Sequence, residues 1–104
     1  MQQGALDSAR AAYRQAIGLN PWEPGAYANL GVADLRDGAL QQAVGALEKA
    51  VELDPGLARA HFLLAGAYVQ LGERTRAAAA VERGLEFDPH NVAARRMLEA
   101  IGTH

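Results

Sequence analysis

Two stretches of sequence decide the fold: AYANLGVADLRDGALQQAVGALEKAVELDP at 26–55 and AHFLLAGAYVQLGERTRAAAAVERGLEFDP at 60–89. The second stretch follows the first at a sequence offset of 34 and carries similar residues at matching positions. Both contain a leucine followed by a small residue, then a glycine, then a closing Asp-Pro. Such similarity at a fixed offset is the sequence signature of a repeat protein.

The same offset extends beyond these two stretches in both directions. Asn20-Pro21 aligns with the two Asp-Pro pairs, and Leu98 aligns with Leu30 and Leu64. Further matching sets are Gly4, Gly38 and Gly72, then Ala9, Ala43 and Ala77, and Ala26, Ala60 and Ala94. The repeat therefore runs through nearly the whole chain.

Each period contains two apolar patterns of helical spacing, separated by a break. Glycine at 38 and 72 can adopt the left-handed conformation that ends a helix. Proline at 21, 55 and 89 cannot continue a helix, and Asn91 is a suitable N-cap. We expect six helices and no strands, at about 5–19, 25–37, 39–53, 58–71, 73–87 and 91–102.

The residues at the matching positions resemble the tetratricopeptide repeat family. The family pattern of an aromatic residue, Leu-Gly, Ala, a large apolar residue, Ala and Pro is matched by Tyr27, Leu30, Gly31, Ala43, Leu47, Ala50 and Pro55. The resemblance implies an all-α, right-handed superhelical solenoid of antiparallel helix pairs. It also implies a concave groove lined by the first helix of each pair, and a function in binding other proteins.

We expect one domain, 1–104, with four parts. Residues 1–23 are the second helix of a truncated repeat, 24–57 and 58–91 are full repeats, and 92–104 are a capping helix. In the cap, Arg95 and Glu99 occupy the face that a partner helix would cover, and their spacing allows them to pair. A charged outer face is what a terminal repeat needs for solubility.

The first helix keeps an apolar face for which the sequence offers no partner. Ala9, Tyr13 and Ala16 match positions that contact a preceding helix. Either the chain is part of a longer array, or this face binds a partner such as a second copy in a homodimer. Both interpretations are kept open.

The family resemblance implies that a peptide or partner segment binds in the groove. The predicted groove residues are Asn29, Val32, Leu35, Arg36, Arg59, Phe62, Gly66, Val69, Gln70 and Arg96, together with Ala28, Leu63, Met97 and Ala100. Several are large and apolar on a face that need not be core, which is typical of a binding surface. Replacing Phe62 by alanine is therefore expected to weaken binding with little loss of helicity.

Three of these groove residues, Arg36, Arg59 and Arg96, are basic, so we expect an acidic or C-terminal peptide as ligand. The family's carboxylate clamp for chaperone tails is incomplete, because only Asn29 and Arg59 match it and Leu63 stands where a basic residue is needed. The family's asparagine ladder is represented by Asn29 alone. We therefore expect no binding of chaperone tails.

Composition and motif searches argue against other functions. The net charge is −2, so there is no basic excess for nucleic acid. There is no cysteine, and His61, His90 and His104 lack metal-ligand spacing. Without a nucleophile beside a base, a phosphate loop or a membrane segment, we predict no enzyme activity, cofactor, metal, nucleic acid or membrane partner. We expect a soluble, cytoplasmic protein, and the preference for arginine over lysine suggests a bacterial source.

Two alternatives to a free peptide-binding scaffold remain at this stage. One is an assembly module that uses the face of the first helix. The other is a segment of a larger enzyme that presents substrate without contributing catalytic residues.

Overall fold

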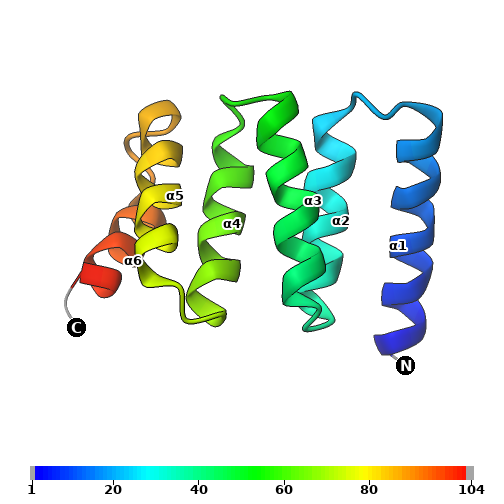
Figure 1. Ribbon diagram of the computed structural model, residues 1–104, viewed down its shortest axis with the longest axis horizontal. Helices are drawn as coiled ribbons and strands as arrows, with labels where there is room; N and C mark the ends of the chain where they lie inside the picture. Colours follow the sequence, from blue (N-terminus) through cyan, green and yellow to red (C-terminus); the bar gives the residue numbers. More distant parts are fainter. Residues whose placement is uncertain (1, 103–104) are drawn as a thin grey trace.

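The computed structural model describes the backbone of residues 2–102 and the side chains from Ser8 onward. Within these residues it contains helices and no strand. The helices are α1 (Gln2–Leu19), α2 (Pro24–Arg36), α3 (Leu40–Leu53), α4 (Ala58–Gln70), α5 (Arg74–Phe87) and α6 (Val92–Gly102). They stand side by side in chain order, each antiparallel to the next, in a body of 39 × 29 × 20 Å (Figure 1).

The predicted helices are confirmed, five of them to within one residue at each end. The first begins at Gln2 rather than near residue 5. Glutamine is a good helix former, and a single glycine such as Gly4 is tolerated without stopping a helix. At the other predicted ends, Gly38 and Gly72 both have a positive φ, the left-handed conformation that closes α2 and α4.

Short hydrogen bonds fix the turns that lead into the first helix of each pair. Asn91 caps α6, because its Oδ1 accepts a hydrogen bond from the Ala94 amide at 2.9 Å, as an N-cap side chain does. Asp54 Oδ1 accepts from the Gly56 amide at 3.1 Å. Asn20 Oδ1 accepts from the Trp22 amide at 3.2 Å. The aligned residues Asn20 and Asp54 therefore form turns of one kind, in which the side chain accepts a hydrogen bond from the backbone amide two residues on.

A second kind of hydrogen bond recurs at the same junctions, and three different side chains make it. Tyr27 Oη donates to the Pro21 carbonyl at 3.2 Å, and Arg95 Nε donates to the Pro89 carbonyl at 2.8 Å. At the equivalent position His61 Nε2 lies 2.8 Å from the Pro55 carbonyl. A carbonyl only accepts, so Nε2 carries the proton there. Each unit thus ties its first helix to the preceding turn, and Arg95 makes this bond where the sequence predicted pairing with Glu99.

Small residues determine how closely the two helices of one unit approach. At Gly31 an added Cβ would lie 2.6 Å from Cγ of Leu47, which is too close for any real contact. Leu47 is fully buried (0% exposed) and fills the space between α2 and α3. The helix pairs α2/α3 and α4/α5 make the most extensive contacts in the array. The predicted Leu-Gly position is therefore a point of close packing between α2 and α3.

An ionic junction that the repeat pattern does not predict joins α1 and α2. Asp34 is 2% exposed, although the aligned residue in the next unit is Tyr68. Arg10 of α1 reaches it, with Nη1 3.5 Å from Asp34 Oδ1 and Nη2 2.9 Å from Asp37 Oδ2. Burial raises the pKa of Asp34, and the Arg10 charge opposes that rise, as expected for a carboxyl in low dielectric beside a cation.

Tyr68 occupies the matching position in the next unit and uses a hydrogen bond instead. Its hydroxyl donates to Glu48 Oε2 at 2.9 Å, and the Arg76 guanidinium lies 5.9 Å from its ring centroid. Burial, with the Glu48 carboxylate, raises the pKa of Tyr68 to about 12. The tyrosine therefore links α3, α4 and α5.

Replacing Tyr68 by phenylalanine is expected to lower the free energy of unfolding by about 1 kcal/mol, the usual value of one hydrogen bond. Because the raised pKa belongs to the folded state, this contribution is complete below about pH 10, the free tyrosine value. It is lost as the pH rises toward 12. Urea unfolding of both proteins at pH 7 measures the difference, with Tyr13→Phe as the matched control. Equal loss in both variants would exclude a special role for Tyr68.

Candidate functional site

The first helices of the units form one continuous face. Helices α2 and α4 contact each other directly, and Arg59 Nη2 on α4 donates to Asn29 Oδ1 on α2 at 2.9 Å. The two predicted groove residues that match the family's clamp are therefore already joined within the chain. The surface between α4 and α6 is hollowed at two places.

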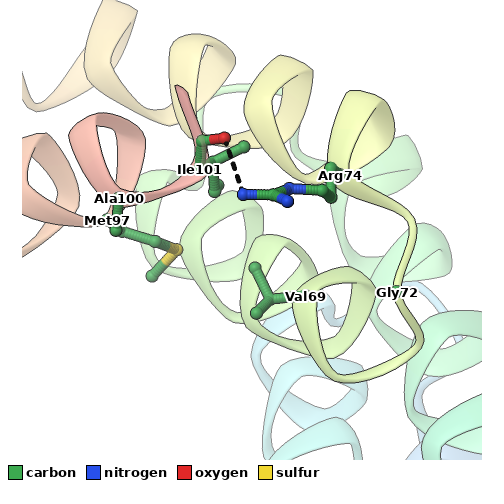
Figure 2. A pocket seen from close by; sticks show the side chains of 6 residues that line it. All are labelled: Val69, Gly72, Arg74, Met97, Ala100 and Ile101. Carbon is green, nitrogen blue, oxygen red and sulfur yellow. Dashed lines mark hydrogen bonds between the residues drawn. The ribbon is translucent and has the colours of Figure 1, made fainter. Parts of the chain in front are cut away.

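The first hollow, here called the Val69 hollow, has a volume of about 360 Å³. It is lined by Val69, Gly72, Arg74, Met97, Ala100 and Ile101. Figure 2 shows Val69 of α4 facing Met97 and Ala100 of α6 across the space, with Arg74 on the third side. Arg74 Nη2 donates to the Ile101 carbonyl at 3.2 Å and so holds the end of α6. The walls are mainly apolar, with one cation at the rim.

The second hollow, here called the Phe62 hollow, has a volume of about 380 Å³. It is lined by Arg59, Phe62, Leu63, Asp88, Asn91 and Met97. Asp88 accepts a hydrogen bond from Asn91 Nδ2 at 3.1 Å, so its carboxylate already has a donor. Met97 lines both hollows and separates them, and methionine adapts its shape readily to a bound group.

The predicted groove residues differ in accessibility. Arg36, Arg59, Val69, Gln70, Arg96 and Ala100 are exposed, whereas Asn29, Val32, Leu35, Phe62, Leu63, Gly66 and Met97 are half-buried. Ala28 is fully buried and cannot contact a ligand, which corrects its assignment to the groove. The two hollows bring together Arg59, Phe62, Leu63, Val69, Met97 and Ala100 from the predicted set.

Phe62 has a structural contact that the sequence pattern does not reveal. A Cβ added at Gly84 of α5 would overlap the Phe62 ring, so the ring packs directly on the glycine backbone. Replacing Phe62 by alanine would therefore remove core packing as well as hollow wall. It is a poor probe of binding, contrary to the sequence-based expectation.

Arg74 and Ile101 line the site without having been predicted. Arg74 begins α5, a second helix of its unit, so a rule that assigns the groove to first helices omits it. The only sequence signal was the alignment of Arg74 with Leu40, a change from apolar to charged at one repeat position. That change suggests a special role for Arg74, but it does not predict that the side chain contacts α6.

The outer face of α1 is partly covered. Ala9 and Tyr13 are half-buried and Ala16 is exposed. Leu19, the last residue of this helix, is 84% exposed, and Trp22, in the turn that follows, is 73% exposed. Of the predicted association face, Ala16 is therefore accessible to solvent, and Ala9 and Tyr13 are accessible in part.

Metal and membrane partners were also considered in the sequence-based predictions. Among the side chains that the structure describes, no group of three or more His, Cys, Asp or Glu residues is placed to hold a metal ion. Within the same part of the chain, no helix combines the length and apolar character required for crossing a membrane.

Comparisons with known proteins agree with the architecture. A family model described as Tetratricopeptide repeat matches residues 34–101, and a second, described as TPR repeat, matches residues 1–38. The chain therefore belongs to the tetratricopeptide repeat family, whose fold is the predicted helical solenoid. No curated protein matches the sequence.

Solved structures of similar fold include interaction domains with bound peptides. The first TPR of Spaghetti (RPAP3), bound to the HSP90 peptide SRMEEVD, has a TM-score of 0.91 and 27% identity, over 95% of this chain and 79% of that one. The Arabidopsis OM64 TPR domain has a TM-score of 0.91 and 26% identity, over 95% and 82%. MamA has a TM-score of 0.90 and 26% identity, over 97% of this chain and 59% of that chain.

Proposed function

We propose that this chain is a non-catalytic binding module that holds a segment of another protein in the groove between α2, α4 and α6. The observation that carries the proposal is the pair of apolar hollows between α4 and α6, rimmed by arginines. Exposed apolar surface with a polar rim is a feature of protein-interaction sites. The structural neighbour with a bound HSP90 peptide supports the same use of the fold.

The domain organisation that we propose follows the repeat. Residues 24–57 and 58–91 are the two full units, 1–23 supply a second helix, and 92–104 cap the array. At the position where Gly31 and Ala65 allow close packing of a second helix, α6 carries the exposed Glu99. A partner helix would have to bury that carboxylate, which is unfavourable without a counter-charge.

The charges of the groove favour an acidic ligand. Arg36, Arg59 and Arg96 are exposed on its helices, and Arg74 borders the Val69 hollow. Leu63, in the wall of the Phe62 hollow, replaces the basic residue that a chaperone tail would need. We therefore propose binding of an acidic segment other than a chaperone tail.

Peptide selection followed by binding measurements tests this function. A library of random twelve-residue peptides displayed on phage is selected on the immobilised chain, and selected peptides are measured by fluorescence anisotropy. We expect acidic, partly apolar sequences whose affinity falls about tenfold or more in Arg59→Glu, since a charge-assisted hydrogen bond contributes about 1.5–3 kcal/mol. The control variant is Arg83→Glu, an exposed arginine on α5 away from both hollows.

Two results would contradict the proposal. One is selection of no peptide, and the other is equal loss of affinity in Arg59→Glu and Arg83→Glu. The peptide SRMEEVD, which the structural neighbour binds, serves as a further probe. We expect it to bind more weakly than the selected peptides, and tight binding would overturn the exclusion of chaperone tails.

Self-association is the second candidate function, because Tyr13 and Ala16 lie on an accessible face of α1. Molar mass by light scattering during size exclusion, at two protein concentrations, decides between the two. A mass near 11.0 kDa at both favours the groove as the main site. A stable dimer that Tyr13→Glu dissociates would favour assembly. The idea that the chain presents substrate within a larger enzyme stays a prediction.

A further inference from the structure

The two hollows lie in line along α4, and their separation constrains what fits them. Phe62 and Val69 are seven positions apart on one helix, which corresponds to about 10 Å along its axis. A protein segment in polyproline II conformation rises about 3.1 Å per residue with three residues per turn. Side chains three positions apart in such a segment are about 9 Å apart and point the same way.

The cations around the hollows indicate the polar part of the ligand. Arg74 borders the Val69 hollow and Arg59 borders the Phe62 hollow, while Asp88 is the single carboxylate among the described residues that line either hollow. The Asp88 carboxylate already accepts from Asn91. The bond to Ile101 occupies Nη2 of Arg74, and a guanidinium has five N–H donors in all. Carboxylates of the ligand therefore have donors at both hollows.

The hollowed surface continues beyond Arg74. Beyond the Arg74–Ile101 hydrogen bond, a further hollow is lined by Thr75, Ala78, Ala79, Glu82 and Gly102, with Arg74 and Ile101 shared. A chain that leaves the Val69 hollow can therefore continue across α5. The geometry favours an internal segment of the partner over a C-terminus that stops at Arg74.

We propose, on the basis of the proposed groove function, that the ligand is an internal, extended acidic segment with two apolar side chains three residues apart. One apolar side chain enters the Phe62 hollow and the other enters the Val69 hollow, with Met97 between them. Glutamate or aspartate beside each apolar residue pairs with Arg59 and Arg74. The spacing of the apolar residues, and not their number alone, sets the affinity.

Designed peptides test the spacing directly. The probes are fluorescein-labelled twelve-residue peptides of Ser and Gly, acetylated and amidated, with two leucines each beside a glutamate. Leucines three positions apart are compared with leucines two and five positions apart. We expect the three-residue spacing to bind at least tenfold more tightly than either alternative, the effect of leaving one leucine unburied. Equal affinity for the three peptides would overturn the spacing.

A thermodynamic cycle that combines a protein variant with peptides of one or two leucines tests whether the second leucine enters the Val69 hollow. Val69→Lys is expected to weaken the three-residue peptide about tenfold or more, and to leave the affinity of a peptide with one leucine unchanged. Val69 is 45% exposed, so the fold should tolerate the change, and circular dichroism checks this. Val92→Lys, at a 59% exposed valine of α6 outside both linings, is the matched control.

The failure of this inference can be told apart from failure of the groove function. If phage-selected peptides depend on Arg59 but ignore spacing and Val69, the groove function stands and the two-hollow ligand is overturned. If a further probe with the leucines seven positions apart binds more tightly than the other three, the ligand is helical, which also overturns an extended segment. If lysines in place of the glutamates leave affinity unchanged, the acidic requirement is overturned.

Discussion

Replacing Leu47 by alanine is expected to lower the free energy of unfolding by about 2–5 kcal/mol, the range for a leucine removed from a closed core. Leu47 is 0% exposed and lies against Gly31, which brings α2 and α3 together. A chain of this size has a total stability of about 5–15 kcal/mol, so the loss is a large share of it. Urea unfolding followed by circular dichroism measures the change. The comparison requires that the slope of the unfolding free energy against urea concentration be the same in both proteins.

Two comparisons make the Leu47 result specific. Leu19→Ala is the matched control, because Leu19 is 84% exposed and the same substitution there should change stability little. Gly31→Ala alone should destabilise, since its Cβ would lie 2.6 Å from Leu47 Cγ. In the Leu47→Ala background the space is open, and Gly31→Ala should then be neutral or stabilising, as alanine favours helix. Additive effects of the two changes would show that the predicted packing position is wrong.

The repeat made most of the fold predictable from sequence. A residue pattern that recurs at an offset of 34 gives the register of every helix at once, so one clear turn such as Asp54-Pro55 supports the others. The positive-φ glycines and the Asn91 cap followed from local chemistry, which does not depend on distant contacts. The helix ends were therefore predicted to within one residue beyond α1.

The candidate site was less predictable, because its shape depends on residues far apart in the chain. Met97 faces Val69 across one hollow and Phe62 across the other, and the distance between α4 and α6 determines whether a hollow exists. A repeat pattern gives which face a residue occupies, but it does not give that distance. For the same reason the pattern placed Ala28 in the groove although the neighbouring helices cover it.

The positions that depart from the repeat pattern were the most informative about contacts between helices. Asp34 stands where the next unit has Tyr68, and Arg74 stands where the preceding unit has Leu40. Each departure marks a polar contact between elements, to Arg10 in one case and to the Ile101 carbonyl in the other. The contact partner of each residue could be identified only from the structure, because the two partners are not separated by a fixed number of residues.

Replacing Arg10 by methionine is expected to destabilise the chain by about 3 kcal/mol at pH 7, because it removes the arginine that pairs with a buried carboxylate and leaves only the smaller effect of Arg14. That carboxylate is Asp34. Methionine keeps the length of the side chain, so the loss reports charge more than packing. In the parent protein burial already raises the pKa of Asp34 against the opposing effect of Arg10. Without Arg10 the pKa should rise further, and Asp34 should take up a proton at a higher pH.

The sign of the pH dependence distinguishes this mechanism from simple loss of packing. A carboxyl whose pKa is raised in the folded state favours folding when protonated, so its contribution is complete below about pH 3.9, the free aspartate value. That contribution is lost as the pH rises through the folded pKa. The stability difference between Arg10→Met and the parent should therefore be largest at neutral pH and shrink toward pH 4. In the double variant Arg10→Met, Asp34→Leu the difference should be small at every pH, since an apolar pair often replaces a buried ion pair without loss. Urea unfolding at pH 4, 5.5 and 7, with all three proteins in the same buffers, measures both effects. A pH-independent deficit in Arg10→Met would mean that the arginine stabilises α1 through packing alone.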